Sequence, residues 1–489
     1  MADDFAFLSA SALSALYRSR KASPVDVIGE TLRRLETYEA AVNAFVLYDP
    51  ATALEMARAA EARWAKGEPL GPLDGVPVAV KDTVEAIGWP RLLGSRTLMP
   101  GAPAHEDSPI TARLRAQGAV FFGKTTTPEF GWKAVTDSPL SGITRNPWDL
   151  ERSPGGSSGG SAVAVLTGLC PLAVGTDAGG SIRIPASFCG IFGHKPTFGR
   201  VAMYPGSVFG DFSQGGPLAR HVADAALMLD AIKGPDARDW HSLPDDGVRY
   251  RDAVGAGSLK GKRIALSASL GYHEPAPAVR QAVERAAEQF ARLGAVVEPA
   301  DPFAGSPGPV FQTLALTAFW ALIRAQKPQA VAVMDPGLVA AAEIGRTVTQ
   351  EQYFDANVQR AALGQSLRRF FERWDLLLSP TMPIPAAYAE PRSGAPGPDN
   401  FLEWLTYTYA FNLTKNPSAS IPCGSADGLP IGLMITGPLY GDLAVLQAAH
   451  AYEQAAGRDW PGADLEHRLA AIAAPADETV KSKLWPKTR

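Results

Sequence analysis

Two Gly/Ser-rich stretches and one distant lysine carry residue types that together can do nucleophilic chemistry. Residues 155–161 read GGSSGGS, residues 175–183 read GTDAGGSIR, and Lys81 ends the apolar run 76–80. A serine hydroxyl is a weak nucleophile until a base takes its proton. A buried lysine can be that base, because burial disfavours its ammonium form. The combination predicts a serine hydrolase that uses lysine instead of histidine, with no metal and no cofactor.

The second stretch has the composition of a loop that could stabilise a negatively charged oxygen. Ser181 follows a predicted strand over residues 172–175 and a Gly-Gly turn. Glycines let backbone amides crowd around one point, so we expect an oxyanion hole formed by the N–H groups of Ala178, Gly179, Gly180 and Ser181. Each well-placed donor can contribute about 3–4 kcal/mol to transition-state stabilisation. A tight turn with glycines at positive φ would give the same pattern, so this motif alone leaves both interpretations open.

The elements that must position these residues alternate between strand and helix. Short apolar runs predict buried strands, and between them apolar residues recur at helical spacing. This alternation predicts an α/β fold with a largely parallel or mixed sheet covered by helices on both faces. Residues 8–66 are predicted to be helical. The strands are expected near residues 76–80, 119–122, 172–175, 263–267, 295–298, 375–378 and 431–436.

These motifs together resemble the amidase signature family of serine hydrolases. Other matching segments are 73–77 (LDGVP), 123–130 (GKTTTPEF), 145–148 (RNPW), 195–197 (KPT) and 427–432 (DGLPIG). The resemblance is densest over residues 70–200 and extends weakly over about 8–455. It implies a central mixed, mostly parallel β-sheet with helices on both faces. It also implies one large domain over residues 67–470, an N-terminal helical segment (1–66) packed on it, a tail (471–489), and a partly separate lobe within 230–380. The last ~15 residues are polar, and we expect them to be loosely held.

The resemblance also assigns roles to individual residues. Ser181 corresponds to the acylated nucleophile, Ser157 to a bridging serine after a cis peptide bond, and Lys81 to the base. Supporting positions that brace the loops match Ser158, Thr176, Asp177 and Arg183. His194 replaces the apolar residue usual before Lys-Pro, and we interpret it as a packed residue rather than a base.

The function implied by this resemblance is hydrolysis of the C–N bond of small carboxamides or N-acyl amines through an acyl-Ser181 intermediate. Aromatic residues could line a pocket for the acyl group or equally pack the core; the candidates are Phe130, Trp132, Trp404 and Phe411. One alternative is the A-type subunit of a glutamyl-tRNA(Gln) amidotransferase complex. Ile184 argues against this alternative, because that subgroup typically has Gln at this position. The other is an inactive binding protein on the same scaffold.

Composition excludes several other classes. The 489-residue chain has a net charge of −4 and 20% charged residues, which gives no reason to expect nucleic acid as a partner. No secretory signal and no apolar segment long enough to span a bilayer are visible, so a cytoplasmic enzyme acting on a small-molecule amide, without membrane, is expected. Relatives often form homodimers, which the resemblance allows here. Residues 118–125 fit the letters of a P-loop, but their strand-like spacer argues against nucleotide binding.

Overall fold

One mixed sheet forms the centre of the molecule. The computed structural model describes residues 5–457, 462–474 and 478–485, and within them the sheet has eleven strands. β2 pairs in parallel with β3 and β6, and β9 pairs in parallel with β10 and β11, whereas the other neighbours are antiparallel. The strand order is β1 (Phe45–Tyr48), β3 (Val120–Thr125), β2 (Pro77–Lys81), β6 (Leu172–Asp177), β8 (Gln214–Ala219), β7 (Phe192–Lys195), β12 (Ser418–Ala426), β13 (Leu429–Thr436), β11 (Leu376–Pro380), β9 (Arg263–Leu266) and β10 (Val296–Pro299).

Helices cover both faces of this sheet, as predicted, and the strand side chains alternate between two cores. In β6, Ala173 packs into the first core, whereas Leu172 and Val174 pack into the second. The first core contains residues of α2 (Pro24–Val42), α5 (Gly159–Leu166), α6 (Arg183–Cys189), α10 (Gly308–Ile323), α12 (Pro336–Arg346), α13 (Gln350–Phe370), α14 (Phe401–Trp404), α15 (Ala410–Leu413), α17 (Ala463–Ile472) and α18 (Glu478–Ser482). The second contains residues of α1 (Ala10–Ser19), α4 (Pro109–Ala116), α7 (Val222–Ile232), α8 (Tyr250–Ala253), α9 (Pro277–Arg292) and α16 (Asp442–Ala456). Both α2, through Val27, and α3 (Pro50–Lys66) contribute to both cores.

Local sequence signals set the helix starts that lead into the site. Ser108 caps α4 by accepting a hydrogen bond from the Thr111 amide, and Pro109 occupies the first helical turn. After this helix, Gly118 adopts φ +81° and β3 begins at Val120. The segment between Gly118 and Thr125 is therefore a strand rather than a phosphate-binding turn. A small hairpin of β4 (Asp137–Ser138) and β5 (Gly142–Ile143) precedes the first Gly/Ser stretch.

Two of the sequence-based expectations need correction. Residues 8–66 are not entirely helical, because β1 lies between α2 and α3 and pairs with β3 at the edge of the sheet. The expectation that the polar C-terminal residues are loosely held is also wrong for the described part, residues 478–485. There Val480 is buried and the Lys483 ammonium pairs with the Glu39 carboxylate at 2.7 Å.

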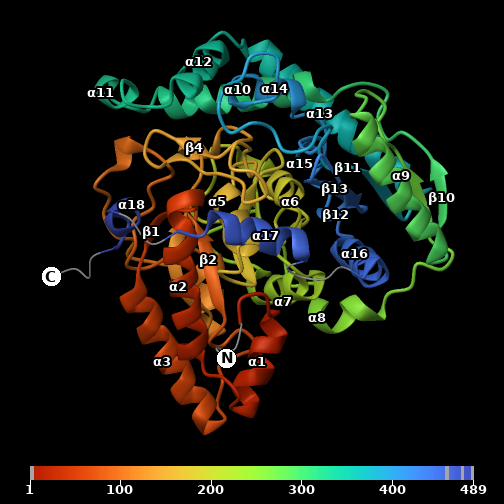
Figure 1. Ribbon diagram of the computed structural model, residues 1–489. Helices are drawn as coiled ribbons and strands as arrows, with labels where there is room; N and C mark the ends of the chain where they lie inside the picture. Colours follow the sequence, from red (N-terminus) through yellow and green to blue (C-terminus); the bar gives the residue numbers. More distant parts are fainter. Residues whose placement is uncertain (1–4, 458–461, 475–477, 486–489) are drawn as a thin grey trace.

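The interval 230–380, expected as a partly separate lobe, divides into two parts. Its strands β9, β10 and β11 continue the central sheet. Its helices α10, α11 (Pro328–Val331), α12 and α13 gather at one end of the molecule, at the top of Figure 1. The domain boundaries given above stay a prediction.

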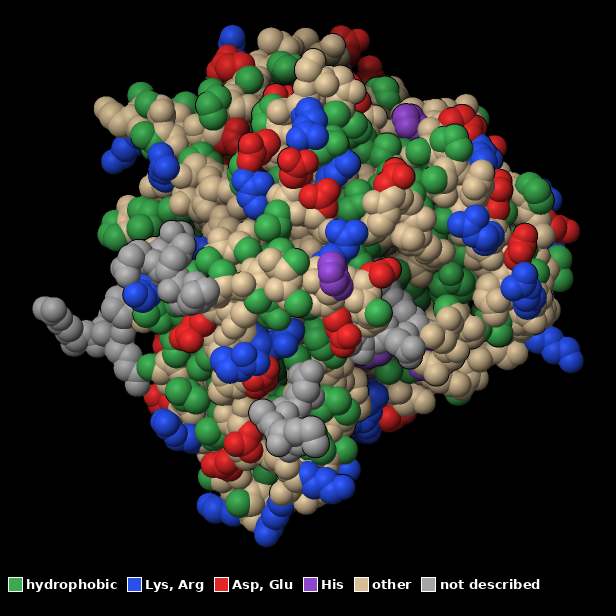
Figure 2. All heavy atoms as spheres, viewed as in Figure 1, with side chains coloured by type: hydrophobic (Ala, Val, Ile, Leu, Met, Phe, Trp, Pro, Cys, Tyr) green, Lys and Arg blue, Asp and Glu red, His purple; other side chains and the backbone are tan. Residues whose placement is uncertain are grey.

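Two further observations concern the charge of the surface and the hydropathy of the helices. On the face seen in Figure 2, acidic and basic side chains are interspersed. Among the described residues, no helix combines the length and the hydropathy needed to cross a bilayer.

Candidate active site

Two adjacent parallel strands bring the candidate base to the second Gly/Ser stretch. β2 is buried along its whole length and ends at Lys81, and it pairs in parallel with β6, which ends at Thr176 and Asp177. The carboxyl ends of parallel strands lie at the same edge of a sheet. The loop that follows β6 carries Ser181, and α5 starts directly after Ser157 and Ser158.

The Lys81 amine lies at the centre of a buried cluster of hydroxyl groups. Its Nζ is 2.7 Å from Ser157 Oγ, 2.9 Å from Ser158 Oγ and 2.9 Å from Thr176 Oγ1. The Lys81 side chain itself has no exposed surface. The peptide bond between Gly156 and Ser157 is cis, as the family resemblance implied.

The contacts of this cluster permit a neutral Lys81 amine to accept a proton from Ser157. The Ser158 hydroxyl donates to the Thr176 carbonyl at 3.2 Å, so it accepts from Lys81. The Thr176 hydroxyl lies 3.3 Å from the Thr83 hydroxyl and can give its own proton there, so it too can accept from Lys81. A neutral amine has two protons and one lone pair. With both protons used, the lone pair faces the Ser157 hydroxyl.

Burial favours the neutral amine that this arrangement needs. Desolvation lowers the pKa of Lys81 to about 7, even though the nearby Asp177 carboxylate acts to raise it. At neutral pH a substantial fraction of the amine is therefore unprotonated and able to accept a proton.

We expect kcat/KM for a neutral amide substrate to rise with pH and to level off above a pKa of about 7. Below this pKa the amine is protonated and cannot act as a base, so the rate should fall about tenfold per pH unit. The measurement is a pH–rate profile from pH 5 to 9 with a substrate that does not titrate in that range. A profile that is flat across this range, or that falls as pH rises through 7, would contradict the assignment of Lys81.

Ser181 lies in the loop between β6 and α6. Its carbonyl accepts a hydrogen bond from the Ser158 amide at 3.2 Å, which joins the two Gly/Ser stretches. The Ser181 side chain lines the same chamber as Ser157. Within the described residues its hydroxyl makes no hydrogen bond, and catalytic hydrogen bonds of this kind often form only when substrate is bound.

The four amides predicted for the oxyanion hole are not equivalent. The Gly180 amide donates to Asp177 Oδ1 at 2.7 Å, so its single proton is not free for an oxyanion and that part of the prediction is wrong. The amides of Ala178, Gly179 and Ser181 make no hydrogen bond within the described residues. Gly180 has φ +131°, and a Cβ there would lie 2.1 Å from Thr408 Oγ1, so glycine is required at this position.

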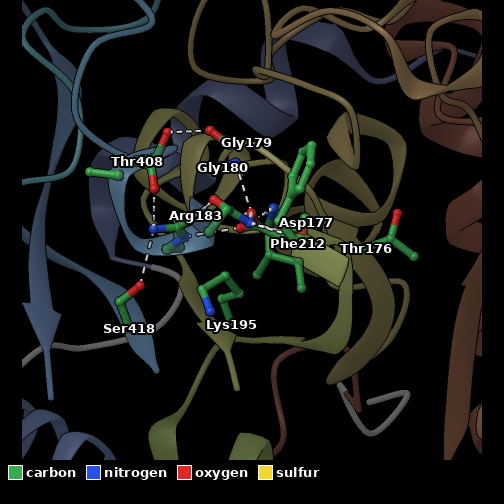
Figure 3. A network of polar contacts seen from close by, with 12 residues as sticks. Thr176, Asp177, Gly179, Gly180, Arg183, Lys195, Phe212, Thr408 and Ser418 are labelled. Carbon is green, nitrogen blue, oxygen red and sulfur yellow. Dashed lines mark hydrogen bonds and ion pairs between the residues drawn. The ribbon is translucent and has the colours of Figure 1, made fainter. Parts of the chain in front are cut away.

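A buried ion pair braces this loop (Figure 3). The Arg183 guanidinium donates Nε to Asp177 Oδ2 at 3.0 Å and Nη2 to Asp177 Oδ1 at 2.9 Å, and neither side chain is exposed. Arg183 also donates to the Thr408 carbonyl and to Ser418 Oγ. Burial acts to raise the pKa of Asp177, but the Arg183 charge and its hydrogen bonds outweigh it and hold this pKa well below the usual range.

Replacing Arg183 with methionine is expected to lower the free energy of unfolding by about 3–5 kcal/mol, because it leaves the Asp177 carboxylate buried without its partner. Urea denaturation at pH 7 measures this loss. In the double variant Asp177→Asn with Arg183→Met neither partner of the pair is charged, so its loss should be smaller than the sum of the two single losses. Full additivity would indicate that the two side chains do not interact.

Two chambers meet at Ser181. The first, which we call the apolar chamber, encloses about 630 Å³ of empty space, including open solvent at its mouth. The charged residue Lys133 also lines it, and the Lys133 ammonium pairs with the carboxylates of Asp137 at 2.8 Å and Asp335 at 2.9 Å. This chamber is lined mainly by Trp132, Ala134, Ile184, Phe209, Phe311, Ala315, Leu316, Phe319, Phe401, Leu402 and Leu405. The second, which we call the mixed chamber, presents hydroxyl groups and one guanidinium. Its lining includes Thr83, Arg91, Leu93, Phe130, Ser157, Thr176, Met203, Ser207, Val208 and Ser213.

The predicted pocket aromatics divide between chamber and core. Trp132 lines the apolar chamber and Phe130 the mixed chamber. Trp404 and Phe411 line neither. Trp404 donates its indole N–H to the Gly397 carbonyl and packs against Phe188, and Phe411 is fully buried with Phe303 in a separate cluster.

Sequence reasoning missed most of the apolar chamber and, among the residues that hold the loop after β6, Thr408 and Asn412. Phe311 and Phe319 come from α10, and Asn412, which donates to Asp177 Oδ1 at 2.8 Å, comes from α15. The apolar character of α10 is visible in the sequence, but it is equally typical of a core helix. His194 is buried in β7 with its Nε2 3.4 Å from Asp442 Oδ1, and no described contact joins it to Lys81, Ser157 or Ser181.

Comparisons with known proteins identify the same family that the sequence motifs resemble. The Amidase family profile matches residues 26–446. The A-type subunit of glutamyl-tRNA(Gln) amidotransferase from Symbiobacterium thermophilum is 36% identical over 91% of this chain and 96% of its own length. A bacterial aryl acylamidase superposes with a TM-score of 0.87 at 31% identity over 95% of this chain and 98% of that chain. The corresponding A-type subunit from Thermotoga maritima superposes with a TM-score of 0.75 at 27% identity, covering 92% and 95%. The chain therefore belongs to the amidase signature family.

Proposed function

We propose that the chain is an amide hydrolase that acts without a partner subunit on amides with an apolar acyl group. The observation that carries this proposal is the meeting of three features at one point. These are a buried lysine hydrogen-bonded to Ser157, the exposed face of Ser181, and an apolar chamber that ends at Ser181.

The proposed reaction has two halves. In the first, Ser181 Oγ forms a bond to the amide carbonyl carbon, while its proton passes to Ser157 and the Ser157 proton passes to the Lys81 amine. The oxyanion accepts hydrogen bonds from the free amides of the 178–181 loop. The C–N bond then breaks, and the amine leaves with a proton returned from Lys81 through Ser157. In the second half water attacks the acyl-Ser181 ester by the same route and releases the carboxylate.

The position of Ser157 supports a proposal for which half of the substrate each chamber binds. The leaving nitrogen must receive its proton from the Ser157 hydroxyl, so it must lie on the side where that hydroxyl is exposed. Ser157 lines the mixed chamber and does not line the apolar chamber. We therefore place the leaving amine in the mixed chamber and the acyl substituent in the apolar chamber.

The lining of the apolar chamber favours an uncharged aryl or alkyl acyl group. Its aromatic and aliphatic side chains bury apolar surface, which stabilises binding by about 25 cal/mol per Å². The ammonium of Lys133 is already paired with two carboxylates and is 7% exposed. A free amino acid with a side-chain amide, such as glutamine, would bring an ammonium and a carboxylate into a space where the described lining residues offer no unpaired charge, which is costly.

The second candidate is an amidotransferase A-type subunit, and the names of the curated relatives favour it. Such relatives share about a third of their residues with this chain along nearly the whole length. Against it stand the apolar chamber and the closer superposition on the aryl acylamidase than on the Thermotoga maritima amidotransferase protein.

The experiment that separates the two candidates uses the purified chain alone. We expect it to hydrolyse benzamides, anilides and hexanoyl amides, and to release ammonia from glutamine at least about 100-fold less efficiently, because two unpaired charges must be buried. Glutaminase activity above that on any apolar amide, or activity that depends on added partner subunits, would favour the amidotransferase. If a fluorophosphonate probe did not label the chain and no amide were hydrolysed, the protein would be an inactive binding protein.

A further inference from the structure

We propose that Arg91 makes this enzyme prefer leaving amines that carry a carboxylate, so that its substrates are N-acyl amino acids with an apolar acyl group. This inference rests on the proposed function, because it concerns the second half of the same substrate. It starts from the mixed chamber, where the leaving amine is placed.

Arg91 is the one charged side chain among the described residues that line the mixed chamber. It shares that lining with Ser157 and Ser181, the two groups next to which the proposed reaction places the leaving nitrogen. The Arg91 side chain is 28% exposed, so its charge is partly desolvated but can still be reached by a substrate. A guanidinium in such a position attracts anions and repels cations.

The loop that carries Arg91 is fixed to the residue next to the catalytic lysine. The Leu92 amide donates to Asp82 Oδ1 and the Gly94 amide to Asp82 Oδ2, both at 3.1 Å. The Lys124 ammonium lies 3.5 Å from Asp82 Oδ1, and the Asp82 and Lys124 side chains are buried. Because Asp82 directly follows Lys81, these bonds hold Arg91 at a defined place relative to the proton relay.

The contact between Arg91 and Glu85 orients the guanidinium without occupying all of it. Arg91 Nε donates to Glu85 Oε1 at 3.1 Å, and the two Nη groups make no hydrogen bond within the described residues. A guanidinium has five N–H donors, and two on one edge match the two oxygens of a carboxylate. Glu85 also offsets part of the Arg91 charge, so removing the Glu85 charge should strengthen the attraction for an anionic substrate.

This placement predicts the order in which leaving groups are accepted. An amine with a carboxylate can receive charge-assisted hydrogen bonds from Arg91, a neutral amine cannot, and an amine with a second ammonium group is repelled. In the reaction the C–N bond breaks, the amino-acid nitrogen takes its proton from Ser157, and the products are an apolar carboxylic acid and a free amino acid.

The test compares substrates that differ only at the leaving group. N-benzoylglycine, N-isobutylbenzamide and N-(2-aminoethyl)benzamide share one acyl group and carry a negative, a neutral and a positive leaving amine. We expect kcat/KM of the wild-type enzyme to be about 10- to 100-fold higher for the anionic than for the neutral substrate, and lowest for the cationic one. Benzoyl derivatives of β-alanine and 4-aminobutyrate measure how far the carboxylate may lie from the amide. Equal values for the anionic and neutral substrates would overturn the proposal.

Four variants connect the preference to this side chain. Arg91→Met should lose the preference for the anion while keeping activity on N-isobutylbenzamide, and Arg91→Lys should retain part of it. Glu85→Gln should widen the preference. Arg96→Met removes an exposed arginine of the same segment that lines neither chamber, so it should leave the preference unchanged. A loss of activity on both substrates in Arg91→Met with a normal preference in Arg91→Lys and Glu85→Gln would show a structural role and overturn the proposal.

The two proposals fail in distinguishable ways. If the enzyme hydrolyses N-isobutylbenzamide well but shows no preference for N-benzoylglycine, the role of Arg91 is refuted and the amide hydrolase remains. If none of the benzoyl or hexanoyl amides is hydrolysed, both proposals are refuted.

Discussion

Replacing Ser181 with alanine is expected to lower kcat for amide hydrolysis by about 10⁴- to 10⁶-fold and to leave the fold intact. The change removes the oxygen that forms the acyl bond, whereas the smaller side chain of alanine fits the same backbone. Turnover of N-isobutylbenzamide measures the loss, and thermal unfolding shows whether the variant is folded.

A matched control comes from the first Gly/Ser stretch. Ser161 is buried, lies 2.7 Å from Thr125 Oγ1 and donates to the Val174 carbonyl, and it has no contact with Lys81 among the described residues. Ser161→Ala should therefore keep most of the activity and remain labelled by a fluorophosphonate, whereas Ser181→Ala should not be labelled. Near-normal turnover by Ser181→Ala would remove this serine from the mechanism.

Replacing Lys81 with methionine is expected to cost about 10²- to 10⁴-fold or more in kcat/KM at pH 7, because the Ser157 hydroxyl loses its proton acceptor. Methionine has a similar length and no charge, so it can occupy the buried site. The rate of the variant should increase with hydroxide concentration and should not level off above pH 7. The measurement is the pH–rate profile of the variant beside that of the wild type.

Lys195 provides an unusually close control for this prediction. It is also fully buried, and desolvation, together with the Arg183 charge, lowers its pKa to about 7. Its Nζ donates to the Pro196 carbonyl at 3.0 Å, and within the described part of the chain it makes no contact with Ser157 or Ser181. Lys195→Met should thus keep the pH dependence of the wild type. If Lys195→Met lost that pH dependence and Lys81→Met kept it, the base would be assigned to the wrong lysine.

The cluster around Lys81, to which the proposal assigns catalysis, could be located from the sequence because its residues lie in short, distinctive segments. The Gly/Ser composition around Ser157 and Ser181, and the apolar strand that ends at Lys81, are local features. The α/β architecture followed from the alternation of strands and helices in the same way. β1 was missed because its four residues lie between two long helices, and its role depends on pairing with β3, a partner distant in the chain.

The substrate chambers could not be predicted because they depend on tertiary contacts. The apolar chamber combines α10 with α14 and the segment after β6, which lie far apart in the sequence. Trp404 and Phe411 have the same residue types as the true lining residues, and only packing separates the two groups. The hydrogen bond that removes Gly180 from the oxyanion hole depends on the orientation of the Asp177 carboxylate, which Arg183 fixes.

The most direct test of the mechanism is the pH dependence of covalent modification by a fluorophosphonate, with the modified residue identified by peptide mass spectrometry. The account predicts a single adduct on Ser181, formed at a rate that rises to a plateau with a midpoint near pH 7. It also predicts that this pH-dependent step disappears in Lys81→Met. An adduct on another residue, or a labelling rate that is the same in wild type and Lys81→Met across this range, would contradict it.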